Sequence, residues 1–386
     1  MEKKTTSIVF TGDIGFDRYM DKKWEDEGLL SQGILDFFQS ADHVVANVEG
    51  AMINGAEDAG GKGIYFHTMN PAAAVFLERI RTDIFCLANN HAMDVGRAGV
   101  ESTKRIAAEM GCKTVGAGID IDEASSPVYL PEAGGIGMIA VGYQPSCVPA
   151  TETEAGCFNW ADLSRIEARV KEIKEKCRWC IVIVHGGEEF APIPSPYTRE
   201  RYHAYIQMGA DIVVGHHPHV AENYEMLENG EKAIFYSLGN FIFDTDNQRK
   251  HLYTEVGILL KLIFTEECFS FEAIGTLLDR ENEHIGKGAL PAIFANIPEE
   301  EYVLLAPLGA WAFMLEEKLR IEFLLPDEYE NATEEKWLAY FKKPRGYVKG
   351  EHNDFDILLP LARESAREEW KKSTLTEIKD YICKLL

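Results

Sequence analysis

Three histidines lie within four positions of one another, directly behind a short apolar run, in the segment 211–224 that reads DIVVGHHPHVAENY. Other apolar runs also end in polar residues that can bind metals. These residues are Asp13, Asn47, Glu49, Asn89, Asn90, His91 and His185, besides His216, His217 and His219. Carboxylate, amide and imidazole groups suit Mn, Fe, Zn or Mg, and no cysteine ends these runs. The pattern therefore predicts an open, catalytic type of centre with one or two divalent metal ions per chain.

These residues must be positioned by the elements that they follow. Seven runs rich in Val and Ile alternate with helix-like stretches, which is typical of an α/β fold whose strands are covered on both faces. The runs are 7–13, 43–50, 83–91, 112–118, 136–143, 180–187 and 211–219. In open α/β sheets, ligands bind beyond the carboxyl ends of the strands. We therefore expect these polar ends to converge on one site.

The pattern changes after residue 230. The runs 232–243, 255–264 and 268–278 follow one another without intervening helices, as in an antiparallel sheet. From about residue 296 the sequence becomes helix-like and rich in charge. We therefore expect a main domain at residues 1–290 and a C-terminal helical segment at residues 291–386.

Charge and hydropathy exclude several classes of partner. The 386 residues carry a formal net charge of −24, which disfavours nucleic acid and anionic membrane surfaces because both would be repelled. No run of about eighteen apolar residues occurs, and the N-terminus lacks the apolar stretch of a signal peptide. These features predict a soluble, cytoplasmic protein without membrane insertion. If the substrate is an anion, positive charge must be supplied locally.

Six motifs, in order along residues 5–275, carry a family resemblance. They comprise Asp13, Asn47-x-Glu49, the segment 89–96 that reads NNHAMDVG, His185-x-Gly187-x-Glu189, the segment 215–220 that reads GHHPHV, and the segment 236–244 that reads YSLGNFIFD. Together they resemble the CapA family, linked to bacterial capsule and poly-γ-glutamate synthesis and related to calcineurin-like metallophosphoesterases. The resemblance implies a metallophosphoesterase-like sandwich of two mixed β-sheets flanked by helices, with a C-terminal helical extension.

The same resemblance implies a role for each residue. Asp13 and His219 would hold one metal ion, and Asn90, His185 and His217 the other. Glu49 would lie between the two, His91 would protonate the leaving group, and His216 would not be a ligand. Asn47, Asn89, Asp94, Glu189 and Asn240 would form the surrounding pocket, and His67 lies in a loop that could reach it. Within that pocket we expect Glu189 to orient His185 and Asp94 to cap a helix.

Two glycines depart from the phosphoesterase pattern. Phosphoesterases usually carry a histidine where this chain has Gly15, so the first metal site would lack one imidazole. At Gly186 the sequence lacks the family's tryptophan, which would remove an aromatic wall from the pocket.

Three functions fit these observations. The leading one is a CapA-like, metal-dependent hydrolase or transferase associated with capsule or poly-γ-glutamate synthesis, acting on an anionic small molecule or polymer. A second is a cytoplasmic metallophosphodiesterase unrelated to capsule. A third is a non-catalytic assembly protein that retains the outline of the site, and partners could include a second copy of the chain or capsule-synthesis proteins. Metal content and turnover of phosphodiesters would discriminate among them.

Overall fold

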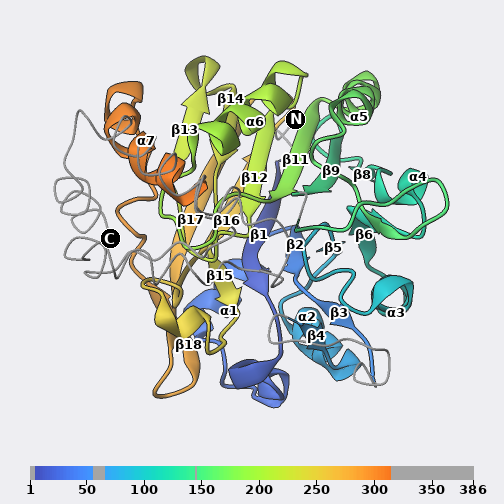
Figure 1. Ribbon diagram of the computed structural model, residues 1–386, viewed down its shortest axis with the longest axis vertical. Helices are drawn as coiled ribbons and strands as arrows, with labels where there is room; N and C mark the ends of the chain where they lie inside the picture. The colour runs from blue at the N-terminus through green and yellow to red at the C-terminus, as the bar shows by residue number, and fades with distance from the viewer. Residues whose placement is uncertain (1–4, 55–65, 144–145, 314–386) are drawn as a thin grey trace, which may run out of the picture.

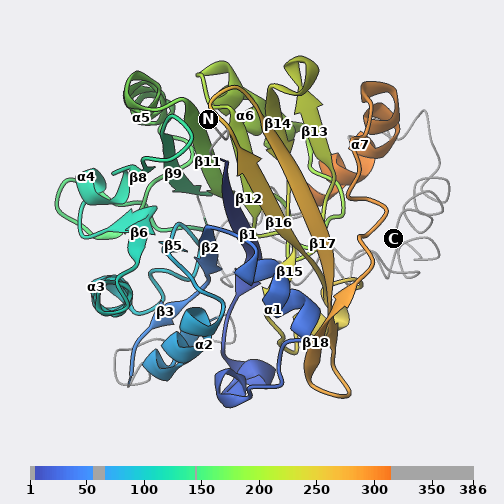
Figure 2. The same ribbon diagram turned by 180° about the vertical axis from the view of Figure 1, so that it is seen from behind.

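Two mixed β-sheets pack face to face in the computed structural model, which describes residues 5–54, 66–143 and 146–313 (Figures 1 and 2). Helices cover the outer face of each sheet, so the described part of the chain has four layers. The predicted sandwich of two mixed sheets flanked by helices is confirmed. No helix within the described ranges is long and apolar enough to cross a membrane.

The first sheet has the strand order β18-β17-β16-β1-β2-β5-β6. Its parallel strands are β1 (Thr6–Ile14), β2 (His43–Val48), β5 (Ile84–Cys86) and β6 (Lys113–Val115). Its antiparallel strands are β16 (Val256–Phe264), β17 (Phe269–Asp279) and β18 (His284–Gly288). Two short pairs lie outside the main sheets, namely β3 (Ala51–Met52) with β4 (Thr68–Met69) and β7 (Ala117–Gly118) with β10 (Gly156–Cys157).

The second sheet has the order β13-β14-β12-β11-β9-β8. Its strands are β13 (Tyr224–Leu227), β14 (Lys232–Phe235), β12 (Ile212–His216), β11 (Trp179–His185), β9 (Ile136–Gly142) and β8 (Val128–Leu130). The inner faces of the two sheets share one apolar core, in which Ile8 and Phe10 of the first sheet meet Ile181 and Ile183 of the second. Alternate residues point the other way, as the two-residue period of a strand requires: Val9 packs outward.

Each outer face is covered by amphipathic helices. On the first sheet these are α1 (Gln32–Gln39), α2 (Ala74–Arg79) and α3 (Gly96–Glu109), and on the second they are α5 (Leu163–Lys176) and α6 (Pro196–Gln207). The short α4 (Ile121–Ala124) lies beside β7. Helix α5 shows the pattern clearly, because Ile166, Val170 and Ile173 recur every three or four residues and are all buried.

The antiparallel prediction for residues 232–278 is correct only in part. Strands β16 and β17 are antiparallel, but β14 pairs parallel with β12 of the second sheet. The next strand, β15 (Asn240–Ile242), pairs parallel with β1 of the first sheet. The chain therefore crosses from one sheet to the other between β14 and β15, and this crossing places Asn240 opposite Asp13.

Helix α7 (Glu299–Phe313) is the last described element. It packs against α6, and the Tyr302 hydroxyl donates a hydrogen bond to the Pro194 carbonyl oxygen at 3.1 Å. The described beginning of the predicted C-terminal segment thus contacts the main domain. The rest of that prediction, residues 314–386, lies outside the described residues, and a boundary at residue 290 stays a prediction.

Candidate metal centre

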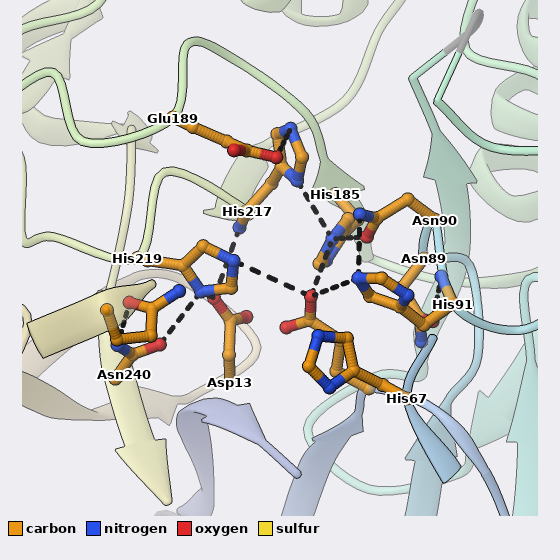
Figure 3. Close-up of polar contacts among 12 residues, drawn as sticks. Asp13, His67, Asn89, Asn90, His91, His185, Glu189, His217, His219 and Asn240 are labelled. Atoms are coloured by element: carbon orange, nitrogen blue, oxygen red, sulfur yellow. Dashed lines mark hydrogen bonds and ion pairs between the residues drawn. The ribbon is translucent and has the colours of Figure 1, made fainter. Parts of the chain in front are cut away.

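Strand register brings the polar ends of both sheets together. Asp13 on β1 is the register partner of Asn47 on β2 and of Asn240 on β15. On the second sheet, β11 ends at His185 beside the end of β12, and His217 and His219 follow directly. Figure 3 shows the side chains of Asp13, His185, His217, His219 and Asn240 gathered at one place. The expected convergence of the strand ends on one site is therefore observed.

Asp13 and His219 form the first group of possible ligands. Nδ1 of His219 lies 3.3 Å from Oδ2 of Asp13 and 2.9 Å from Oδ1 of Asn240. Burial alone would raise the pKa of Asp13, but hydrogen bonding and the positive charge of His219 hold that pKa below its ordinary value. Burial opposes protonation of His219, yet the charges of Glu49 and Asp13 raise its pKa to about 9. The raised pKa of His219 and the lowered pKa of Asp13 both favour a charged pair at this position.

Asn90, His185 and His217 form the second group. Nε2 of His185 lies 2.8 Å from Oδ1 of Asn90 and 3.2 Å from Nδ1 of His217. Burial, followed by repulsion from His217, lowers the pKa of His185 well below its ordinary value. A neutral imidazole is the form that binds a metal. The backbone φ of His217 is 99°, a value that favours glycine, and such strain often occurs at functional sites.

Glu49 lies between the two groups. Its Oε1 lies 3.7 Å from Nε2 of His185, 3.9 Å from Nε2 of His91 and 3.8 Å from Nε2 of His219. Neither carboxylate oxygen has a hydrogen-bond partner, although the side chain is completely buried. Burial, and then repulsion from Asp13, raises the pKa of Glu49 well above its ordinary value.

Unsatisfied oxygens of this kind suit the binding of a cation. Most buried polar atoms in proteins have partners, and a buried carboxylate without one is costly. Asp13, Glu49 and His219 each offer one ligand atom, and these atoms lie within 4.8 Å of one another. Oxygen and imidazole nitrogen in one buried cluster suit Mn, Fe, Zn or Mg. The residues present therefore fit a divalent metal ion.

His91 faces the same centre from the loop after β5. Its Nδ1 lies 2.8 Å from Oδ2 of Asp94, and its Nε2 lies 3.1 Å from Nδ2 of Asn90. The expectation that Asp94 caps a helix is wrong, because α3 begins at Gly96 behind Val95 and has no side-chain cap. Asp94 instead orients His91. Burial raises the pKa of Asp94 to about 6, whereas burial and the neighbouring His67 lower that of His91 well below its ordinary value.

The remaining predicted pocket residues take different places. Nδ2 of Asn47 donates to Oδ1 of Asp13 at 2.6 Å and lies 3.3 Å from Nδ1 of His185, so it joins the two groups. Asn89 donates to the Val48 carbonyl oxygen at 2.8 Å and ties two neighbouring strand ends together. Glu189 was expected beside His185, but it lies beside His217, with Oε1 4.0 Å from Nε2 (Figure 3).

His216 has a structural place. Its Nε2 lies 2.8 Å from the carbonyl oxygen of Thr11, so it joins β12 to β1 behind the centre. His67 does reach the site, because its ring contacts the ring of His91 edge to face, with centroids 4.3 Å apart.

Aromatic side chains fill the space beside Gly15 and the space beside Gly186. A Cβ atom on Gly15 would lie 2.7 Å from the ring of Phe243, which also contacts His219 at a centroid distance of 4.8 Å. No imidazole could fit there unless Phe243 moved. A Cβ atom on Gly186 would lie 2.7 Å from Cβ of Tyr143 and 3.0 Å from the ring of Trp160. The expected loss of an aromatic wall is therefore wrong, because Tyr143 and Trp160 fill this space.

Sequence reasoning missed several residues that support the site. Asp17 contacts His67, with Oδ2 2.6 Å from Nδ1, and Gln248 accepts a hydrogen bond from Nδ2 of Asn240 at 3.0 Å. Phe190 stacks between His219 and His251. Asp17 lies four residues after Asp13, and that spacing is the one signal that could have drawn attention to it.

Comparisons with solved structures give distant matches. A phosphatase from Mycoplasma pneumoniae matches with a TM-score of 0.43 and 14% identity, over 71% of this chain and 94% of that one. A putative 5′-nucleotidase from Staphylococcus aureus matches with the same TM-score and identity, over 80% of this chain and 59% of that one.

Sequence comparisons are more decisive. The PGA biosynthesis protein CapA of Bacillus subtilis is 32% identical over 244 residues, which is 62% of this chain and 63% of the relative. The capsule biosynthesis protein CapA of Bacillus anthracis is 28% identical over 256 residues, 63% of this chain and 61% of the relative. The chain thus spans less than two thirds of the length of these relatives. The profile of the family described as "Bacterial capsule synthesis protein PGA_cap" matches residues 7–245, and the chain belongs to that family.

Proposed function

We propose that this chain is a metal-dependent hydrolase or transferase that acts on an anionic substrate in capsule or poly-γ-glutamate synthesis. The observation that carries the proposal is Glu49, a completely buried carboxylate with two unpartnered oxygens and three imidazoles within 3.9 Å of Oε1. A closed structural site would satisfy such a group within the protein. An open catalytic centre leaves it for a cation.

Two ligand sets are available around Glu49. Asp13 and His219 would hold one ion, and Asn90, His185 and His217 would hold a second, with Glu49 between them. Bound divalent ions would supply Lewis acidity and a water of lowered pKa. Asn47 and Asn240 would orient Asp13 and His219 through the hydrogen bonds described above, in the manner of residues that support metal ligands.

His91 would move the proton. Because Nδ1–H of His91 would donate its hydrogen bond to Asp94, Nε2 is the atom that faces the centre and would exchange a proton with the substrate. Burial makes the imidazolium form scarce but a strong donor. An anionic group beside Nε2 would favour that form, so His91 could be charged when the leaving oxygen needs a proton.

An anionic substrate follows from the local charge and from the family. The site gathers four imidazoles, and bound divalent ions would supply local positive charge within a chain whose net charge is −24. The relatives' names refer to capsule and PGA biosynthesis, which suggests an acidic polymer or its precursor. A cytoplasmic location and association with itself or with capsule-synthesis proteins complete the proposal.

The test begins with elemental analysis of the full chain purified without added metal or chelator. We expect one or two equivalents of Mn, Fe, Zn or Mg, and turnover of bis(p-nitrophenyl) phosphate or cleavage of poly-γ-glutamate by the metal-loaded protein. His217→Ala should lose the ion of the second set and keep the fold. His284→Ala, which changes a histidine on β18, is the matched control.

Each contrary result has a definite meaning. Retention of full metal stoichiometry by His217→Ala would remove His217 from the ligand set. A metal-free protein without turnover even after metal loading would overturn the enzyme proposal in favour of an assembly protein.

A further inference from the structure

A second carboxylate–imidazole pair adjoins His91. Oδ2 of Asp17 lies 2.6 Å from Nδ1 of His67. The backbone N–H of His67 donates to Oδ2 of Asp94 at 2.7 Å, and this is the same oxygen that lies 2.8 Å from Nδ1 of His91. The rings of His67 and His91 are also nearly perpendicular, at 83°, with centroids 4.3 Å apart. His67 thus contacts His91 directly through its ring (Figure 3) and indirectly through Asp94.

We propose that Asp17 and His67 form a positioning pair that holds Nε2 of His91 toward Glu49. The inference rests on the proposed function, because it assigns the pair to the proton transfer by His91. Asp17 fixes the ring of His67, and that ring fixes residue 67 so that its N–H stays on Asp94. Asp94 is thereby held in the orientation in which its Oδ2 contacts Nδ1 of His91.

Rotation of the His91 ring is the motion that the pair restrains. If the ring turned over, Nδ1 would leave Asp94, and Nε2 would leave its position 3.9 Å from Glu49. The ring of His67, which is in contact with the ring of His91, would obstruct that turn. Without the Asp17–His67 pair, the His91 ring would sample orientations in which neither ring nitrogen contacts the substrate. Misplacement of this kind lowers turnover more than binding.

The exposure of these side chains supports a role at the open edge of the centre. Asp17, His67 and Asp94 are 14%, 10% and 17% exposed, whereas Glu49 is 0% exposed. The pair therefore lies nearer to solvent than Glu49 does.

The first experiment separates turnover from binding. Asp17→Asn and His67→Asn should each lower kcat on bis(p-nitrophenyl) phosphate by about 10–100-fold, with KM and metal content within twofold of wild type. Asp21→Asn is the matched control, because it removes the same charge four residues away at an exposed position, and it should leave kcat unchanged. Loss of metal from Asp17→Asn, or an unchanged kcat, would overturn the proposal.

A double variant tests whether the pair acts through His91. In a His91→Asn background, adding Asp17→Asn should lower the residual kcat by less than twofold, because residues that act as a unit are not additive. A full additional 10–100-fold loss would show that Asp17 acts independently of His91 and would refute the positioning role.

A spectroscopic measurement keeps the inference separate from the enzyme proposal. The His91 Nδ1 proton, assigned in ¹⁵N-histidine-labelled full-length protein by its absence from His91→Asn, should exchange slowly with water. Asp17→Asn should make it exchange at least tenfold faster, and Asp21→Asn should not. This readout needs no turnover, so a protein that fails as an enzyme can still pass it. An unchanged exchange rate in Asp17→Asn would reject the pair.

Discussion

Replacing Glu49 by Gln tests the metal centre through stability. In the metal-free protein, one oxygen of Asp13 and one of Glu49 lie within 4.8 Å, and Nε2 of His219 lies 3.8 Å from Oε1 of Glu49. If all three groups are charged, this repulsion and this attraction are each about 4 kcal/mol at an effective dielectric constant of about 20 and nearly cancel; if Glu49 is neutral, neither applies. What remains is the cost of buried, unsatisfied oxygens, about 1–3 kcal/mol. Glu49→Gln should therefore leave the metal-free protein as stable as wild type, or up to about 2 kcal/mol more stable.

Glu188 gives a matched contrast, because it is also buried but its carboxylate is satisfied. It accepts hydrogen bonds from the backbone N–H of Ser195 at 3.0 Å, the Ser195 hydroxyl at 2.7 Å and the Thr198 hydroxyl at 2.7 Å. Glu188→Gln weakens these bonds at the start of α6 and should cost about 1–3 kcal/mol. The same substitution at two buried glutamates is thus expected to differ in sign.

Urea denaturation in EDTA and in Mn²⁺ measures both effects. At an ion concentration of 100 times Kd, wild type and Glu188→Gln should each gain about 2.7 kcal/mol, whereas Glu49→Gln should gain almost nothing. The reasoning is refuted if Glu49→Gln destabilises the metal-free protein as much as Glu188→Gln does. It is equally refuted if Mn²⁺ stabilises Glu49→Gln as much as wild type.

Three further predictions concern single side chains. His91→Asn should lower kcat by about 10²–10⁴-fold and leave the metal content unchanged, and loss of metal on elemental analysis would make His91 a ligand instead. Gly15→Ala should lower the free energy of unfolding in urea by about 1–3 kcal/mol because its Cβ would meet Phe243. Adding Phe243→Leu should restore part of that stability. A Gly15→Ala variant as stable as wild type would refute the tight contact. Glu225 is bound by Arg199, His203 and Tyr236; burial would raise its pKa, but these partners lower it from 4.5 to about 2. Ionised Glu225 contributes up to about 3 kcal/mol to the free energy of unfolding; this contribution is present above pH 4.5 and is lost as the pH falls toward 2. The difference in unfolding free energy between wild type and Glu225→Gln, measured by urea denaturation, should therefore vanish over that pH window.

The sequence predicted which side chains would meet, but not how they are supported. Strand ends are visible in a sequence because buried runs stop at polar residues, so the convergence of Asp13, Glu49, His185 and His217 could be expected. The hydrogen-bond partner of each side chain could not be predicted in this way. Asp94 has the residue type of a helix cap, but α3 begins at Gly96 and Asp94 does not cap it. Its contact with Nδ1 of His91 is visible only in the structure.

The glycines show a second limit. A glycine in a motif reports that a side chain is missing, but it does not report what fills the space. Phe243 lies 228 positions from Gly15 in the chain, and Trp160 lies 26 positions from Gly186. Only the crossing of the chain from β14 to β15 brings Phe243 against the first strand. Tertiary packing of this kind leaves no local signal.

The two sheets contribute different chemistry to the centre, and this division has a consequence for dynamics. The first sheet would supply oxygen ligands through Asp13 and Glu49, and the second would supply imidazoles through His185, His217 and His219. A bound ion would therefore join the two layers at the ends of β1 and β12, where side-chain contacts such as that of Asp13 with His219 already bridge them.

Hydrogen exchange should detect that junction. On adding Mn²⁺ to the metal-free protein, amides near residues 13–15 of the first sheet and 215–219 of the second should gain protection together, because local opening of either layer would now break metal ligands. Helix α5 on the outer face should change little, which provides an internal control. A gain confined to one sheet would mean that the ion binds on one layer only, and the assignment of ligands to both sheets would then be wrong.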